Sequence, residues 1–117
     1  MTVQRVLAVV AVSDLDEATD WYERLTGSPP TNRPMPTLAE WQITADGWLQ
    51  VTADKHRAGS SMANFTVDDL ASHIEQLAGR GLAPGTVVEA DKGVQLCSLT
   101  DPDGNAITFI GGFRPQY

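Results

Sequence analysis

The chain has 117 residues, a formal net charge of −7 and 42% hydrophobic residues, which is typical of one ordinary globular domain. No basic patch that would bind nucleic acid is visible, and no apolar run approaches the ~20 residues of a membrane-spanning helix. The single Cys97 cannot form an internal disulfide, and the apolar run near the N-terminus is too short for a signal peptide, so we expect a cytoplasmic protein.

The N-terminal third predicts a strand followed by a helix. Val6–Val12 is a continuous run of apolar, mostly β-branched residues, which indicates a strand covered on both faces. Apolar residues then recur at helical spacing and predict a helix over Leu15–Thr26. Asp14 with Glu17 resembles a capping box at its start, and Gly27 is a natural stop.

The next segment predicts a loop and a hairpin. Residues 31–38 contain two prolines and read as a loop with room for a short edge strand. Strands are predicted over 40–45 and 48–53, because the intervening Asp46-Gly47 pair is a strong signal for a two-residue hairpin turn.

The second half repeats this order of elements. Val12-Ser13-Asp14-Leu15 has a counterpart in Val67-Asp68-Asp69-Leu70, after the strand 62–67. The rest of this half predicts a helix from Leu70 to about Ala78, strands over 86–89, 94–100 and 106–110, and a turn at Asp101-Pro102-Asp103-Gly104-Asn105. We therefore expect a single domain with module one at about 3–53, a linker at about 54–61, module two at about 62–110, and a tail at 111–117.

These motifs, V-S-D-L, V-D-D-L and D-P-D-G-N before the last strand, resemble the vicinal oxygen chelate superfamily over most of the chain. This group contains glyoxalase I, extradiol dioxygenases, fosfomycin-resistance enzymes and bleomycin-resistance proteins. The resemblance implies an α+β fold of two βαβββ modules, the glyoxalase/bleomycin-resistance/dihydroxybiphenyl dioxygenase-like fold. It also implies a homodimer with clefts at or near the subunit interface.

The resemblance also implies four positions at which metal-dependent members carry His, Glu or Gln ligands. In this sequence they fall on Leu7, Met62, Thr108 and, with a less certain alignment, Gln50. Leucine has no lone pair, a thioether suits soft ions, and catalytic zinc sites need three protein ligands. We therefore expect no metal, no other cofactor and no metal-dependent enzyme activity.

Strand alternation places further residues beside these four positions, because residues two apart share a face. The predicted ligand-binding cleft is apolar with neutral polar groups, and aromatic side chains flank it. It comprises Leu7, Val9, Trp41, Trp48, Gln50, Met62, Asn64, Ser98 and Thr108. Cys97 is expected in the core, and His73 on a half-exposed helix surface without a functional role.

The leading hypothesis is a metal-free protein that binds and sequesters a small organic molecule, for example an antibiotic, as in the bleomycin-resistance branch. The acidic charge and the tryptophans favour a cationic or aromatic ligand. The alternative is a metal-independent lyase or isomerase of the glyoxalase-like superfamily, for which Glu40, Asp54, His56 and Glu89 are candidate acid/base groups. A third is a structural or regulatory subunit whose cleft has lost its function. No catalytic residue is assigned.

Overall fold

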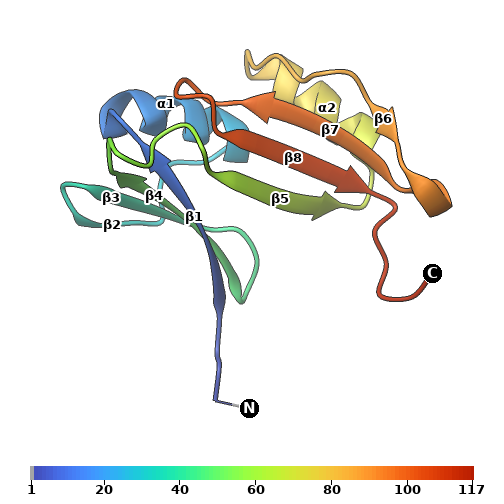
Figure 1. The fold of residues 1–117 in the computed structure, drawn as a ribbon, viewed down its shortest axis with the longest axis horizontal. Helices are drawn as coiled ribbons and strands as arrows, with labels where there is room; N and C mark the ends of the chain where they lie inside the picture. The colour runs from blue at the N-terminus through green and yellow to red at the C-terminus, as the bar shows by residue number, and fades with distance from the viewer. Residues whose placement is uncertain (1) are drawn as a thin grey trace.

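The computed structural model describes residues 2–117, in which two βαβββ units follow one another (Figure 1). The first unit comprises β1 (Val6–Val12), α1 (Leu15–Thr26), β2 (Asn32–Met35), β3 (Leu38–Gln42) and β4 (Gly47–Ala53). The second comprises β5 (Met62–Val67), α2 (Leu70–Gly79), β6 (Val88–Glu89), a 3-10 turn over Asp91–Gly93, β7 (Gln95–Thr100) and β8 (Ala106–Gly111). No helix within residues 2–117 is long and apolar enough to cross a membrane.

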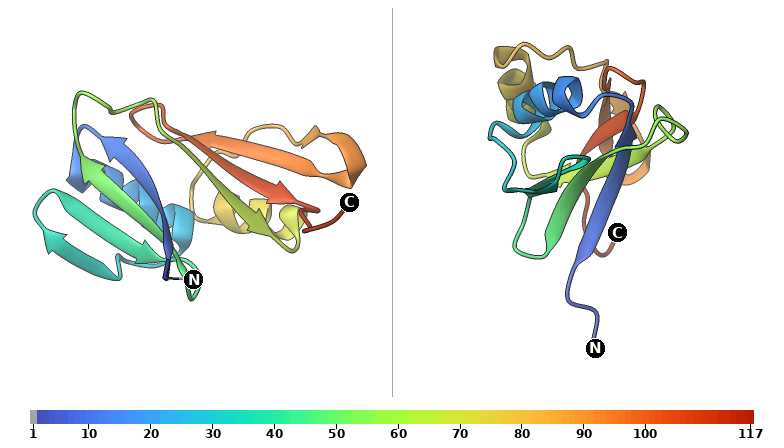
Figure 2. Two further views of the ribbon diagram at one scale, coloured as in Figure 1. Left: turned by 60° about the horizontal axis from the view of Figure 1, so that its bottom comes forward. Right: turned by 90° about the vertical axis from the view of Figure 1, so that its left-hand side faces the viewer.

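Each unit forms one four-stranded sheet, and the two sheets have the same topology. The strand orders are β1-β4-β3-β2 and β5-β8-β7-β6. In each sheet the first strand pairs in parallel with the last strand of its unit, and the other pairings are antiparallel. The sheets lie beside each other, with β1 next to β5, and both helices lie on one side of them (Figure 2). This is the predicted α+β fold of two equivalent modules.

The two helices begin at equivalent aspartates. Asp14 Oδ1 accepts a hydrogen bond from the backbone N–H of Glu17 (3.1 Å) at the start of α1. Asp69 Oδ1 accepts one from Ser72 N–H (3.0 Å) at the start of α2. Each bond satisfies a helix N–H that has no partner within its own helix. The predicted N-cap of α1 is therefore confirmed, and α1 ends at Gly27, which has φ 78°.

The predicted hairpin at Asp46-Gly47 is wrong in detail. Strand β3 ends at Gln42 and β4 already begins at Gly47, so the connection is longer than two residues. Gly47 C=O accepts hydrogen bonds from Ile43 N–H (2.9 Å) and Thr44 N–H (3.0 Å). The register of β3 and β4 consequently differs from that of a two-residue turn, and this decides which side chains share a face.

The D-P-D-G-N turn joins the two units. Asn105 is fully buried, and its Oδ1 accepts hydrogen bonds from Gly59 N–H (3.0 Å) and Ser61 N–H (2.8 Å). Its Nδ2 donates to Ala11 C=O on β1 (2.7 Å) and to Asp101 Oδ2 (2.8 Å). One amide thus ties the last turn of the second unit to the first strand and to the loop between the units.

Tyr22 extends this network into the core of the first unit. The buried Tyr22 hydroxyl donates to Asp101 Oδ2 (2.7 Å). Burial, together with this hydrogen bond to Asp101, raises the pKa of the phenol. The tyrosine therefore keeps its proton and acts as a hydrogen-bond donor that orients the carboxylate.

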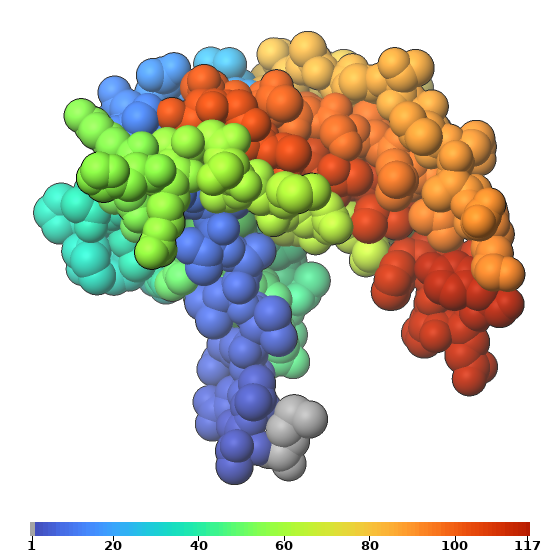
Figure 3. Space-filling view, viewed as in Figure 1, coloured from blue at the N-terminus to red at the C-terminus, as the bar shows by residue number. Residues whose placement is uncertain are grey.

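The space-filling view shows an uneven outline (Figure 3). The N-terminal segment leading into β1 and the C-terminal tail after β8 both project on the same side, and a hollow lies between them. Several apolar side chains near this side are exposed, among them those of Val3, Val6, Leu7 and Phe113. The molecule therefore presents apolar surface that its own helices do not cover.

Candidate functional site

The side of each sheet away from the helices carries exposed apolar residues. Leu7 is 44% exposed and Val9 54% exposed on β1, and Met62 on β5 is 78% exposed. Their strand neighbours Val10 and Ala63 face the helices and are buried. We call these two uncovered sides the first open face, on β1, β3 and β4, and the second open face, on β5, β7 and β8. Exposed apolar surface of this kind commonly marks an interaction site.

The first open face combines apolar and polar side chains. In the parallel pairing of β1 with β4, Leu7 lies opposite Trp48 and Val9 lies opposite Gln50. Trp48 is half-buried, and its indole Nε1 is a buried atom without a hydrogen-bond partner among residues 2–117. An indole N–H usually finds a partner when it is buried, so Trp48 has an unpaired donor that lies beneath this face.

A carboxylate also lies on the first open face. Glu40 on β3 pairs with Gln50 on β4, and Gln50 Nε2 donates to Glu40 Oε2 (2.6 Å). Asn32 Nδ2 donates to Glu40 Oε1 at 3.4 Å. The amide groups hold the carboxylate in one orientation, where it can pair with a cation or accept a hydrogen bond from a ligand.

A recess of about 300 Å³ lies at the end of this face near the inter-unit loop. Its strand wall is formed by Val9, Ala11 and Thr52, and its loop wall by Asp54, Arg57, Ser60 and Ser61. Arg57 Nε lies 3.8 Å from Asp54 Oδ2 in an exposed ion pair. The recess thus places an apolar floor beside charged and hydroxyl groups.

The second open face is more neutral. Asn64 on β5 lies opposite Thr108 on β8, and Thr108 lies opposite Ser98 on β7. The Ser98 and Thr108 hydroxyl oxygens are 2.7 Å apart and share a hydrogen bond. Met62 continues the same face with an exposed thioether. This surface offers neutral donors and acceptors beside apolar contact area.

The structure divides the predicted cleft residues into two groups. Leu7, Val9, Trp48 and Gln50 share the first open face, and Met62, Asn64, Ser98 and Thr108 share the second. The two sheets lie beside each other within the chain (Figure 2), where Ala11 N–H donates to Ser61 Oγ (3.0 Å). Within one chain, therefore, the two groups line neighbouring surfaces.

The placement of Trp41 corrects the expectation that both tryptophans flank one cleft. Trp41 lies opposite Leu49 in the pairing of β3 with β4, and it is 1% exposed on the helix side of the sheet. Its Nε1 donates to Ser28 C=O (3.0 Å). Trp48 faces the other side of the sheet. Trp41 shares a face with its partner Leu49, and Trp48, the residue before Leu49 on β4, points to the opposite face.

The side chains at the positions where the resemblance implies a metal do not fit one. Leu7 has no donor atom, the Gln50 amide nitrogen is bonded to Glu40, and the Thr108 hydroxyl is shared with Ser98. Within residues 2–117 no three His, Cys, Asp or Glu side chains are grouped as a metal site requires. A neutral amide and a neutral hydroxyl make a weak donor set for a divalent ion.

Cys97 has no visible catalytic role. It is buried on the helix side of β7, and its Sγ lies 3.3 Å from Gly85 C=O. Burial raises the pKa of this thiol, which keeps it protonated and unreactive. The expectation that Cys97 is a core thiol is confirmed.

Comparison with known proteins agrees with this geometry. A family model described as a glyoxalase-like domain matches residues 7–110. A glyoxalase/bleomycin resistance protein from Catenulispora acidiphila is 31% identical, with a TM-score of 0.87 over 93% of this chain and 98% of that one. No curated protein matches the chain.

Two more distant structures share the fold alone. A bleomycin-binding protein solved in complex with bleomycin is 22% identical, with a TM-score of 0.73 over 96% of this chain and 100% of that one. A lactoylglutathione lyase from Agrobacterium tumefaciens is 15% identical, with a TM-score of 0.77 over 96% of each chain. The same fold therefore occurs in a binding protein and in an enzyme.

Proposed function

The chain belongs to the glyoxalase-like domain family, and on that premise we propose that it binds and sequesters a small organic molecule without a metal. The observation that carries this proposal is the exposure of Leu7, Val9 and Met62 on the two open faces, beside neutral polar side chains. Apolar surface with a few convergent polar groups is the usual lining of a small-molecule site.

In our proposal the cleft forms between two copies of the chain in a homodimer. The first open face of one copy would lie opposite the second open face of its partner, so that Trp48 and Gln50 of one face Met62 and Asn64 of the other. The uncovered apolar surface and the hollow beneath the sheets (Figure 3) support this arrangement. Closure would bury apolar side chains that one chain leaves in water.

The first open face favours a flat ligand with a positive charge. The Trp48 ring provides a stacking surface, and Glu40 places a carboxylate on the same face. The net charge of −7 would favour the approach of a cation. Bleomycin is a suitable first probe because a protein of the same fold binds it.

The test is a tryptophan-fluorescence titration with metal-free bleomycin. We expect saturable quenching, and we expect Trp48→Phe to remove most of the signal while the drug is recovered unchanged. The matched variant Trp21→Phe, on α1 and away from the open faces, should keep the titration. If quenching is absent at drug concentrations well above the micromolar range, bleomycin is not a ligand. Other planar cations then take its place as probes.

The alternative function is a metal-independent lyase or isomerase reaction, and Glu40 is the observation that favours it. Its carboxylate lies on the first open face, with Oε2 bonded to Gln50 and Oε1 3.4 Å from Asn32 Nδ2, where the group could accept a proton from a bound substrate. An enzyme would convert its ligand and lose turnover in Glu40→Gln. A sequestering protein would return the ligand intact, and Glu40→Gln would only weaken the binding of cations.

A further inference from the structure

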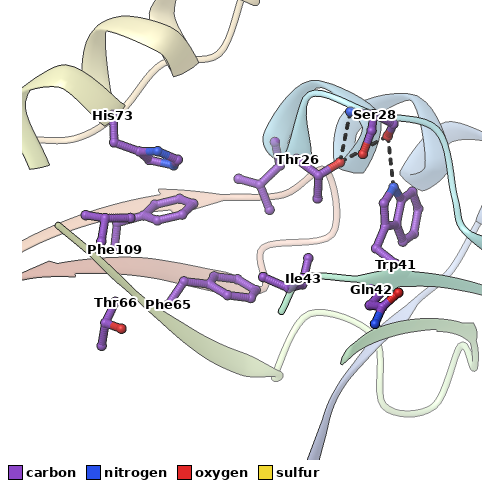
Figure 4. Close-up of a pocket in the computed structure, with 11 residues that line it drawn as sticks. Thr26, Ser28, Trp41, Gln42, Ile43, Phe65, Thr66, His73 and Phe109 are labelled. Carbon is purple, nitrogen blue, oxygen red and sulfur yellow. Dashed lines mark hydrogen bonds between the residues drawn. The ribbon is translucent and has the colours of Figure 1, made fainter. Parts of the chain in front are cut away.

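A second pocket lies between the two units on the helix side, away from both open faces (Figure 4). It has a volume of about 190 Å³. The first unit contributes the end of α1 and the end of β3, and the second unit contributes β5, α2 and β8. Its principal side chains are Thr26, Trp41, Ile43, Phe65, His73 and Phe109. This pocket plays no part in the proposed binding between open faces.

One wall of the pocket is a cluster of three aromatic rings. The Phe65 and Phe109 rings are stacked with centroids 5.6 Å apart and an angle of 28° between their planes. The His73 imidazole lies 4.4 Å from the Phe109 ring centroid at 47°. Figure 4 shows Ile43 and Trp41 on the opposite side, so a planar molecule could lie between aromatic and aliphatic surfaces.

His73 presents an unused polar atom in these apolar surroundings. Its Nε2 is buried and has no hydrogen-bond partner among residues 2–117. Burial lowers the pKa of the imidazole, the Arg80 guanidinium lowers it further, and the Asp68 carboxylate opposes them. The ring is therefore neutral near pH 7 and can offer one donor and one acceptor nitrogen.

Two neighbouring polar groups, those of Thr26 and Trp41, already have partners. Thr26 Oγ1 donates to Tyr22 C=O (2.9 Å), which is a bond within α1. The Trp41 indole N–H donates to Ser28 C=O (3.0 Å). A buried polar atom without a partner is unusual in a folded protein and needs an explanation. A bound molecule that pairs with His73 Nε2 would supply that explanation.

We propose that this pocket binds a small aromatic molecule that carries one hydroxyl or ring N–H group, and that this group pairs with His73 Nε2 once the imidazole turns and brings this buried atom to the cavity surface. The volume suits a single substituted ring, because an apolar protein cavity of about 150 Å³ holds benzene. The aromatic wall would contact the ring, and the hydrogen bond would select its orientation and its polar substituent.

The experiment uses phenol and toluene, which have nearly the same shape and differ in the hydroxyl. The ring resonances of His73, Phe65 and Phe109 are followed by NMR during titration of the wild-type protein, and those of Phe65 and Phe109 during titration of the His73 variant. We expect saturable shifts with phenol and binding of toluene that is weaker by on the order of tenfold, the value of one hydrogen bond. His73→Phe keeps an aromatic ring in place and should abolish this preference.

A second variant fills the pocket without touching His73. Ile43 is 38% exposed at the rim, so Ile43→Trp can add volume with little effect on the fold, which circular dichroism checks. This variant should block both probes and leave the affinity for bleomycin at the open faces unchanged, although the new tryptophan adds to the total fluorescence. Absence of saturable shifts with millimolar phenol, equal affinities for phenol and toluene, or undiminished binding by Ile43→Trp would overturn the proposal.

Discussion

The two histidines have the same side chain and very different surroundings. His56 is exposed in the loop between the units. His73 lies against Phe109, and its Nε2 is buried. The helical pattern around His73 places it at the edge of an apolar stripe, which predicts partial exposure but does not reveal the Phe109 ring of a distant strand. Only the packing of α2 on β8 distinguishes a surface histidine from one that lines a pocket.

The lowered pKa of His73 predicts an effect of acid on stability. The unfolded chain takes up a proton on His73 near pH 6.5, while the folded chain resists protonation until a lower pH. Between these values the unfolded state binds more protons, so the free energy of unfolding falls as the pH is lowered. Urea denaturation at about pH 7.5 and about pH 5.5 measures this change.

Two variants isolate the contribution of His73 to this change in stability. His73→Phe should show a smaller loss of unfolding free energy between the two pH values than the wild-type protein. His56→Gln, in the exposed loop, should retain the wild-type difference. An unchanged pH dependence in His73→Phe would show that the folded protein protonates His73 as readily as the unfolded chain does.

At the scale of elements, the register between β3 and β4 is the feature that the sequence did not predict, and it decides which side chains share a face. The alternation along β1, β5, β7 and β8 assigns Leu7, Met62, Ser98 and Thr108 to one face of their strands, and the structure leaves these faces uncovered. The prediction that β1 is covered on both faces is therefore wrong, because no helix of residues 2–117 packs on its second face. For β3 the face depends on its pairing. A two-residue turn would pair residue 45 with 48, whereas the structure pairs Gln42 with Trp48. This change moves Trp41 into the core and brings Glu40 beside Gln50.

We expect the side-chain amide of Asn105, in the D-P-D-G-N turn, to contribute strongly to the free energy of unfolding. Asn105→Ala removes the hydrogen-bond partner of Gly59 N–H, of Ser61 N–H and of Ala11 C=O. The bond to Ala11 is buried, and the other two are partly buried. Because each buried unsatisfied group costs about 1–3 kcal/mol, we expect the free energy of unfolding to fall by about 3 kcal/mol. Chemical denaturation of wild type and variant measures the difference.

The matched variant is Asn32→Ala on the exposed strand β2, whose amide makes one long hydrogen bond to Glu40. It should change the free energy of unfolding by less than about 0.5 kcal/mol. A similarly small effect of Asn105→Ala would mean that water replaces the lost amide, and that the D-P-D-G-N turn does not join the units as the hydrogen bonds indicate.

At the scale of the whole molecule, the repeated order of elements was enough to predict two modules, but not how their faces meet. The structure shows that Leu7 and Met62 are uncovered, yet the alternation along their strands does not indicate which surface lies opposite them. Within the chain the Asn105 amide and the Ala11–Ser61 bond hold the sheets side by side. In our proposal a cleft that uses both open faces forms between two copies of the chain, so its formation depends on protein concentration.

This dependence gives the prediction that tests the assembly. Leu7→Lys places an ammonium group on the first open face, where our proposed homodimer would bury it without a partner. Since removing a charge from water is costly, the dissociation constant of the dimer should rise by at least about tenfold. Sedimentation equilibrium of wild type and variant measures the change. The control Glu75→Lys adds the same group on the exposed surface of α2 and should leave assembly unchanged.

If Leu7→Lys dissociates the dimer, bleomycin binding should weaken in parallel, because each cleft takes one face from each copy. A wild-type protein that stays monomeric at high concentration and still binds its ligand would instead show that a single open face is sufficient.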